Sequence, residues 1–125
     1  MTNLFLIFIG SGTGGICRYL VSNLAFMLFG RIFPFGTLIV NITASFLMGV
    51  LFVLLTDRIY DFGPELRSLL LIGFLGGFST FSALSIETLN LLERGSITMA
   101  TLNIIANITL CLLAVWAGVA GGRSL

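Results

Sequence analysis

The chain has 125 residues, of which 58% are hydrophobic and only 9% are charged, and its mean hydropathy is +1.14. This composition excludes a soluble globular domain, whose surface requires many more charged groups. A membrane span takes about 20 residues, so the sequence predicts a single domain, residues 1–125, that four spans fill. The absence of histidine excludes a histidine-ligated metal and a histidine general base, and the two cysteines lie in apolar segments that predict no disulfide framework.

The first predicted span covers residues 4–29. Gly10 and Gly14 are four residues apart on one helix face, a spacing that favours close packing against another helix. Arg18 lies deep in the same segment, where a charge is costly unless it faces a water-filled cavity, an acidic partner or an anion pathway. Snorkelling of the long side chain to the membrane interface is the alternative interpretation of Arg18.

The second predicted span covers residues 35–56, and no charged residue occurs between positions 32 and 56. Thr37, Asn41 and Ser45 follow one another at intervals of four, so they share one face of a helix. An asparagine near the middle of a bilayer needs hydrogen-bond partners. Asn41 therefore either lines a functional pathway or joins two helices by a hydrogen bond that only holds the bundle together.

The third predicted span covers residues 68–92 and includes an unusual stretch, residues 73–88, with three glycines, five hydroxyl residues and one acid. Gly76 and Gly77, followed by Ser79 and Thr80, predict an interrupted helix whose freed carbonyls and amides could bind ions near mid-membrane. Alternatively, the glycines serve only close helix packing. Glu87 is expected within the membrane or facing a vestibule, and a snorkelling or helix-end acid is the alternative interpretation.

The fourth predicted span covers residues 97–122. Asn103, Asn107 and Cys111 fall at intervals of four and form a narrow polar stripe on an otherwise apolar helix. Because a polar stripe facing lipid would be costly, we expect it to face protein or a pore.

Basic residues give almost no preference for one orientation in the membrane. With four spans, Arg58, Arg67 and Arg123 fall in the ends and loops on one side of the membrane. Arg31 and Arg94 fall in the loops on the other side. The chain is therefore expected to insert in both orientations and to pair as an antiparallel dimer. Four short spans would also make a poor pore alone.

Taken in order, these motifs resemble the small bacterial fluoride channels of the Fluc or CrcB family over nearly the whole chain. The resemblance rests on residues 10–19, on residues 34–41 and most specifically on residues 73–82, followed by Ser85 and Glu87. It implies an all-α membrane protein with four transmembrane helices, the third broken near mid-membrane. It also implies an antiparallel dual-topology dimer in the bacterial inner membrane, in contact with lipid, with two separate anion pathways.

The resemblance assigns roles to individual residues. Asn41 would donate a hydrogen bond to fluoride, and Phe81 would face the ion with the edge of its ring. The other residues assigned to the pathway are Arg18 in a vestibule, and Phe78, Ser82 and Thr37. Phe78 has ordinary core packing as its alternative, because the chain contains 12 phenylalanines.

A structural sodium ion is the one cofactor that the resemblance implies. Backbone carbonyls of Gly77 and Thr80 would hold it at the centre of the dimer.

Three positions depart from the family pattern. Leu84 stands where a second pathway phenylalanine is expected, Ala83 replaces a hydroxyl residue, and Cys111 replaces a residue that is often serine. A homodimer would therefore pair Phe81 with Leu84 in each pathway. This departure leaves three alternatives open: a slower channel, a heterodimer with a paralogue that supplies the missing ring, and an engineered variant.

The chemistry of the polar residues suits fluoride, a small and strongly hydrated anion. Asn41, Thr37, Thr80 and Ser82 can replace water with N–H or O–H donors without introducing a fixed negative charge. The edge of an aromatic ring carries partial positive charge, so Phe81 can face an anion edge-on.

The sequence thus predicts passive export of fluoride through a selective channel. A pore-deficient partner subunit of a heterodimeric channel is one alternative. A proton-coupled small multidrug exporter is another, but that class is expected to need an acid in the first span, which here contains Arg18 and no acid. The chain carries no ATP-binding or cofactor motif, so we expect neither an enzyme nor a nucleic-acid partner.

Overall fold

The computed structural model describes residues 1–59, 61 and 63–125, and in these residues the regular structure is helical. The helices are α1 (Thr2–Phe29), α2 (Phe35–Asp57), α3 (Gly63–Leu66), the π-helix η1 (Arg67–Leu75), α4 (Gly76–Phe78), α5 (Phe81–Glu93) and α6 (Ile97–Ser124). Four segments are long and apolar enough to cross a membrane: α1, α2, α6 and the composite segment Gly63–Glu93. The protein is therefore a four-span membrane protein.

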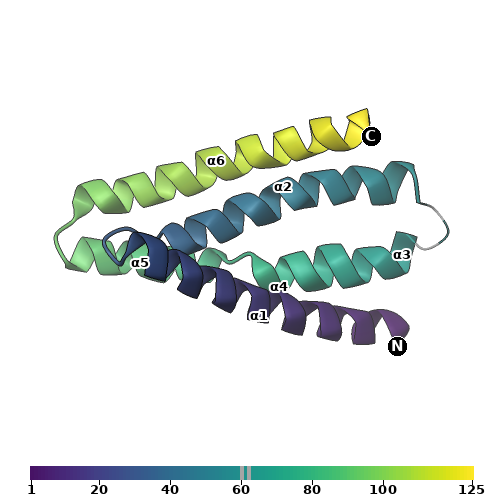
Figure 1. The fold of residues 1–125 in the computed structure, drawn as a ribbon, viewed down its shortest axis with the longest axis horizontal. Coiled ribbons are helices and arrows are strands. Elements are labelled where there is room, and N and C mark those ends of the chain that lie inside the picture. Colours follow the sequence, from purple (N-terminus) through teal and green to yellow (C-terminus); the bar gives the residue numbers. More distant parts are fainter. Residues whose placement is uncertain (60, 62) are drawn as a thin grey trace.

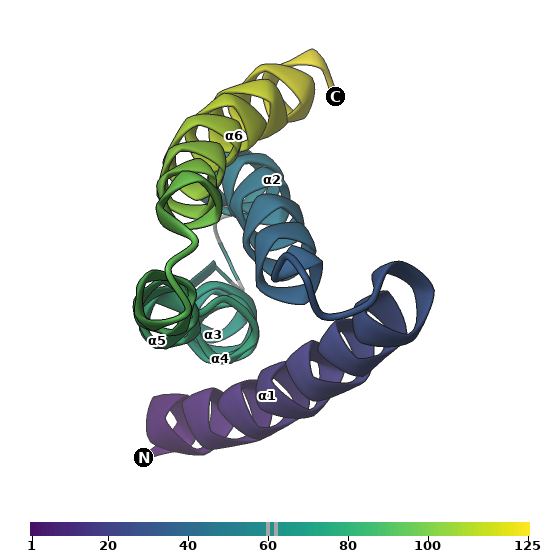
Figure 2. The ribbon, with the colours of Figure 1, turned by 90° about the vertical axis from the view of Figure 1, so that its left-hand side faces the viewer.

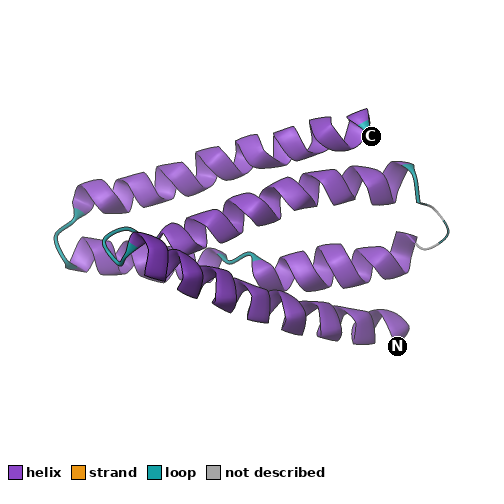
Figure 3. Cartoon of the chain, viewed as in Figure 1, coloured by secondary structure: helices purple, strands orange, loops and turns teal. Residues whose placement is uncertain are grey.

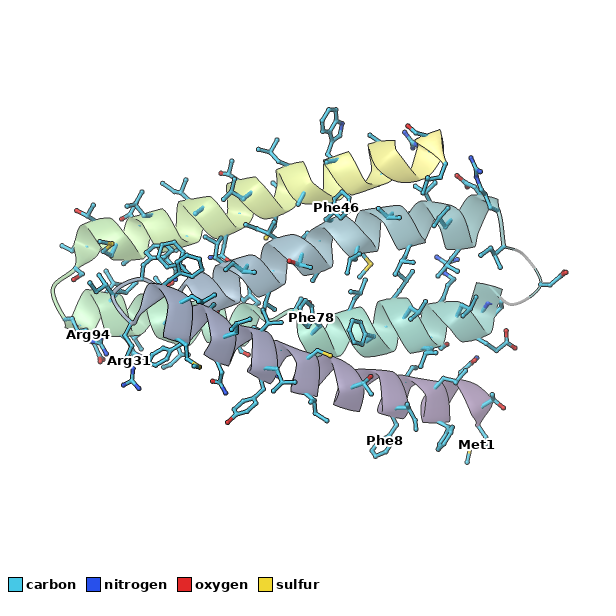
Figure 4. All side chains as sticks on the ribbon, viewed as in Figure 1. Met1, Phe8, Arg31, Phe46, Phe78 and Arg94 are labelled. Atoms are coloured by element: carbon cyan, nitrogen blue, oxygen red, sulfur yellow. The ribbon has the colours of Figure 1, made fainter. Side chains whose placement is uncertain are left out.

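The four spans form one bundle in which the two termini lie at the same end (Figure 1). Helices α2 and α6 run side by side, while α1 crosses the bundle on the opposite side of the α3–α5 segment from α6 (Figure 2). The α1–α2 and α5–α6 connections lie together at the other end, where Figure 4 labels Arg31 and Arg94. The two sides predicted for the arginines are thus the two ends of the bundle.

Glycines set the distance between neighbouring helices. A Cβ added at Gly118 on α6 would collide with the carbonyl oxygen of Phe46 on α2. A Cβ at Gly10 or Gly14 on α1 would collide with backbone atoms of η1. The close-packing face predicted from the spacing of Gly10 and Gly14 is therefore confirmed, because only a bare backbone lets these helices approach so closely.

The third span is interrupted, as predicted, but the break lies at the hydroxyl residues and not at the glycines. Gly76 and Gly77 are helical in α4, whereas Ser79 (ψ 156°) and Thr80 (ψ 118°) are extended. Figure 3 shows this break as a short loop segment between two helices. Gly77 instead serves packing, since a Cβ there would lie 2.5 Å from the carbonyl oxygen of Ser11.

The apolar core is small and lies between α2 and the third span. It includes Val40, Ala44, Leu75 and Phe78, whereas many large apolar side chains point outward (Figure 4), as Phe8 does. In water this exposure would be unfavourable, but hydrocarbon solvates such side chains as well as a protein interior does. The chain therefore relies on backbone approach and polar contacts to hold its helices together.

Candidate functional site

Asn41 lies opposite the break in the third span and bonds to it at two points. Its Oδ1 accepts a hydrogen bond from the backbone N–H of Thr80 at 2.9 Å, and its Nδ2 donates to the carbonyl oxygen of Thr80 at 3.1 Å. Nδ2 also donates to Oδ1 of Asn107 on α6 at 3.1 Å. Asn41 therefore satisfies backbone groups that the break withdraws from the helix, which is what a break in a membrane requires.

These bonds settle how Asn41 is used within one chain. Both hydrogens of its amide group are donated to protein acceptors, so the interhelical-bond interpretation describes the structure. Donation to an ion would replace one of these two bonds.

Thr80 ends the break and begins the next helix. Its Oγ1 accepts a hydrogen bond from the backbone N–H of Ala83 at 3.1 Å, which makes Thr80 the N-cap of α5. Its hydroxyl also lies 3.2 Å from that of Ser82. The first turn of α5 thus presents backbone amides and the positive end of a helix dipole at the break.

A cavity of about 360 Å³ opens at this point and is referred to below as the Asn41 cavity. Phe81 and Leu84 both contribute to its wall, but Phe81 is 75% exposed and points away from the bundle, whereas Leu84 is 6% exposed. The remaining lining residues are Asn41, Ser45, Ser79, Thr80, Asn107, Ile108, Cys111 and Leu112. The cavity is a mainly apolar space, and a cluster of neutral polar groups lies at its end near the break.

Arg18 lies in a different cavity, of about 610 Å³, between α1 and the start of α5. Thr37 and Glu87 line it as well, and the hydroxyl of Thr37 donates to Oε1 of Glu87 at 2.6 Å. The other oxygen of Glu87 is buried and has no hydrogen-bond partner among the described residues. Thr80 lines both cavities, so the break lies between them.

The structure thus brings together part of the predicted site. Asn41, Thr80 and Phe81 share one cavity, and Arg18 and Thr37 share the neighbouring one. Ser82 is exposed on α5 beside the break.

Phe78 lies away from these cavities. It is 5% exposed, stacks on Phe74 with ring centroids 5.8 Å apart, and points into the bundle (Figure 4). In the single chain it is a core residue, which is the alternative interpretation of Phe78.

Two contacts of the site were not predicted: Thr37 with Glu87, and Asn41 with Asn107. Their partners are 50 and 66 residues apart in the sequence, so no local spacing indicates them. The polar stripe of α6 was a partial signal, because it predicted that Asn103 and Asn107 face protein or a pore. Both are buried in the bundle, which agrees with that expectation.

The implied sodium ligands fit the ion chemically. The carbonyl of Gly77 accepts no hydrogen bond within the described residues, because the break removes its helical partner. The carbonyl of Thr80 accepts one bond, from Asn41, and retains a second lone pair. Hard oxygen donors of this kind suit an alkali cation, as the carbonyls of ion-channel filters do.

Comparison with known proteins gives a consistent result along almost the entire chain. A family model described as "CrcB-like protein, Camphor Resistance (CrcB)" matches residues 5–119. A Coxiella burnetii protein named "Fluoride-specific ion channel FluC" is 54% identical over 123 residues, which cover 98% of this chain and 99% of that protein.

Two further relatives carry the same name. One from Shewanella baltica is 47% identical over 118 residues, covering 94% of each chain. One from Methylococcus capsulatus is 45% identical over 123 residues, which cover 98% of this chain and 54% of that protein.

Proposed function

Because the chain belongs to the CrcB family, we propose that it forms a fluoride-selective channel through which fluoride leaves the cell passively. Its similarity to proteins named fluoride-specific ion channels, over nearly the full length of the chain, supports this assignment. The observation that carries the proposal is the position of Asn41, which offers neutral donors at a helix break between two cavities.

Conduction of fluoride requires that the protein replace the water around the ion. Asn41 supplies N–H donors, and the first turn of α5 supplies backbone amides and a partial positive charge. Phe81 adds a ring whose edge favours an anion. Because the Asn41 cavity contains no acidic side chain among its lining residues, no fixed negative charge opposes the ion there.

The Arg18 cavity is the proposed vestibule. The guanidinium of Arg18 gives a positive potential that attracts anions. Glu87 shares this cavity, with one carboxylate oxygen held by Thr37. We therefore place the narrow part of the route on the side of Thr80 that faces Asn41 and Phe81, beyond the vestibule that contains the carboxylate.

An antiparallel dimer completes the proposed channel. Phe81 and Ser82 are exposed on α5 next to the break, at a point that a single chain would present to lipid. Irregular backbone within the hydrocarbon layer is tolerated only when protein or a water-filled cavity covers it. A second copy would cover this face and would set Phe81 of one chain against the pathway of the other.

A structural sodium ion belongs to the same proposal. Gly77 and Thr80 would hold it through their backbone carbonyls, and it would add positive charge near the break. The carbonyl of Gly77, left without a helical partner, supports this placement.

The decisive test is fluoride efflux from liposomes that contain the purified protein alone. The wild-type chain should release fluoride rapidly and retain chloride. Asn41→Asp should abolish release, because a carboxylate offers no N–H donor and adds negative charge at the break. Asn3→Asp, an identical change at an exposed position near the start of α1, should leave efflux unchanged.

Two results would contradict the proposal. Folded wild-type protein that releases no fluoride would show that the chain is not a self-sufficient channel, and co-reconstitution with a paralogue that has the second phenylalanine would then test the partner-subunit alternative. Equal release of chloride would contradict selectivity.

A further inference from the structure

A buried chain of hydrogen bonds leads from Asn41 across α6 to α5. Asn107 accepts from Asn41 at 3.1 Å and donates from its Nδ2 to Oδ1 of Asn103 at 3.1 Å and to the backbone oxygen of Asn103 at 2.9 Å. Asn103 donates to Oγ1 of Thr88 at 3.1 Å. Thr88 donates to the carbonyl oxygen of Leu84 at 2.7 Å. The set Asn107, Asn103 and Thr88 is called the amide relay below.

Two backbone carbonyls, those of Leu84 and Asn103, fix the direction of the bonds in the amide relay. The carbonyl of Leu84 can only accept, so the hydroxyl of Thr88 donates to it and its oxygen is left to accept from Asn103. Asn103 then turns its oxygen to Asn107, and Asn107 turns its oxygen to Asn41. Asn41 therefore faces an acceptor that cannot reverse without breaking both bonds that Asn107 donates to Asn103.

The amide relay is also buried, and of its three residues only Asn107 borders the Asn41 cavity. Asn103 is 0% exposed and Asn107 is 2% exposed, and both Nδ2 hydrogens of Asn107 serve the contact with Asn103. The other acceptor of Asn41, the carbonyl of Thr80, lies on extended backbone and borders both cavities. Of the two bonds that Asn41 donates, the one to Thr80 is thus the bond that an ion in the cavity can replace.

We propose that Asn107, Asn103 and Thr88 are positioning residues for the anion site. They hold one hydrogen of the Asn41 amide in place, so that the other points into the cavity when an anion takes it from Thr80. The relay contains no ionisable group, so it fixes the donor without adding charge to the pathway. This inference rests on the proposed fluoride channel, in which Asn41 is the ion's donor.

The test removes the far end of the relay, at a position outside the lining of the Asn41 cavity. Thr88→Val keeps the size of the side chain and leaves Asn103 without its acceptor, whereas Thr88→Ser keeps the hydroxyl. Thr101→Val is the matched control, because Thr101 makes the same bond to the carbonyl four residues before it, but on an exposed face of α6.

Liposome efflux at low protein density separates the two roles that Thr88 could have. The fraction of active vesicles measures how much protein folds, and the rate within active vesicles measures conduction by each channel. Thr88→Val should lower the rate per channel about tenfold. This is the effect expected if orienting the Asn41 amide contributes as much free energy as one interhelical hydrogen bond. Thr88→Ser should restore the rate, and Thr101→Val should not change it.

A second measurement follows Asn41 itself and does not depend on transport. The side-chain amide resonances of Asn41 in micelles, identified by their loss in Asn41→Ser, should shift in Thr88→Val and not in Thr101→Val. If Thr88→Val prevents folding, Asn103→Leu, which removes the middle of the relay at similar volume, takes its place in both measurements.

The outcomes distinguish the two proposals. Conduction by the wild type with an unchanged rate in Thr88→Val would overturn the inference and leave the channel intact. A loss of active vesicles at constant rate per channel would show that the relay only holds the bundle together. Absence of conduction in the wild type would contradict the proposed function. If the Asn41 resonances were then also unchanged in Thr88→Val, the positioning role would be overturned as well.

Discussion

Leu84 is the residue at which the pathway of this chain differs most from its expected chemistry. It contributes to the wall of the Asn41 cavity beside Phe81 and is 6% exposed, so it faces the cavity and the core and not lipid. An aliphatic side chain closes the space against larger molecules but offers no positive edge to an anion. In the proposed pathway, each chain therefore lacks the second aromatic contact that the resemblance implies.

Leu84→Phe should raise the fluoride efflux rate per channel. The gain should be roughly threefold to tenfold if a ring edge facing the ion is worth as much as an aromatic pair contact. Leu91→Phe, at another buried position on α5 outside the Asn41 cavity, controls for the effect of a larger side chain. A rate that stays constant or falls in well-folded Leu84→Phe would show that the position does not face the ion.

At the scale of the helices, bare backbone surfaces set the architecture. Gly49 on α2 and Gly118 on α6 each leave room for the carbonyl of the partner helix, and Gly10 and Gly14 do the same between α1 and η1. In a bilayer there is little hydrophobic gain when two apolar helices associate, so the closeness of the backbones supplies much of the attraction. This closeness also brings Asn107 of α6 within hydrogen-bond distance of Asn41 on α2.

Gly118→Ala should destabilise the folded protein in detergent by about 1–3 kcal/mol, the usual cost of forcing extra atoms into a packed interface. The added Cβ would press on the carbonyl of Phe46 and push α2 and α6 apart. Gly121→Ala is the matched control, because its Cβ would meet no atom within 4 Å. The free energy of unfolding in mixed detergent measures both, and equal values for the two variants would argue against this packing role.

At the scale of the whole molecule, charge gives the chain little preference for one orientation. The two ends of the bundle carry three and two arginines, respectively: Arg58, Arg67 and Arg123 with the termini, and Arg31 and Arg94 with the other two connections. A difference of one positive charge hardly favours one topology, so both insertions should occur in the cell. Equal amounts of the two would supply both halves of an antiparallel dimer.

Single cysteines should reveal this dual topology. In a background with Cys17 and Cys111 replaced by alanine, Glu93→Cys and Ser124→Cys mark opposite ends of the bundle. Each cysteine should react with a membrane-impermeant thiol reagent from both sides of the membrane. About half of the molecules should be labelled from each side, because the two orientations are equally populated. Labelling of Glu93→Cys from one side and of Ser124→Cys from the other would contradict the antiparallel dimer.

The sequence by itself determined the class of protein and the number and approximate position of its spans, because these depend on the local density of apolar residues. It also indicated a broken third span, since hydroxyl residues after glycines are poor continuations of a membrane helix. It placed the break within residues 76–80, but it could not tell that Gly76 and Gly77 stay helical. Glycine is permissive in either conformation, and the break falls at Ser79 and Thr80 because their side chains and Asn41 satisfy the released backbone groups.

The site was predicted as a set of residues but not as a geometry. Asn41, Phe81 and Arg18 were identified individually, yet only the tertiary structure separates Arg18 and Thr37 from the Asn41 cavity and places Phe78 in the core. The pairing of Asn41 with Asn107 joins two helices far apart in the sequence. Such contacts are decided by how closely helices approach and how they are rotated, and these follow from glycine packing along the bundle as a whole.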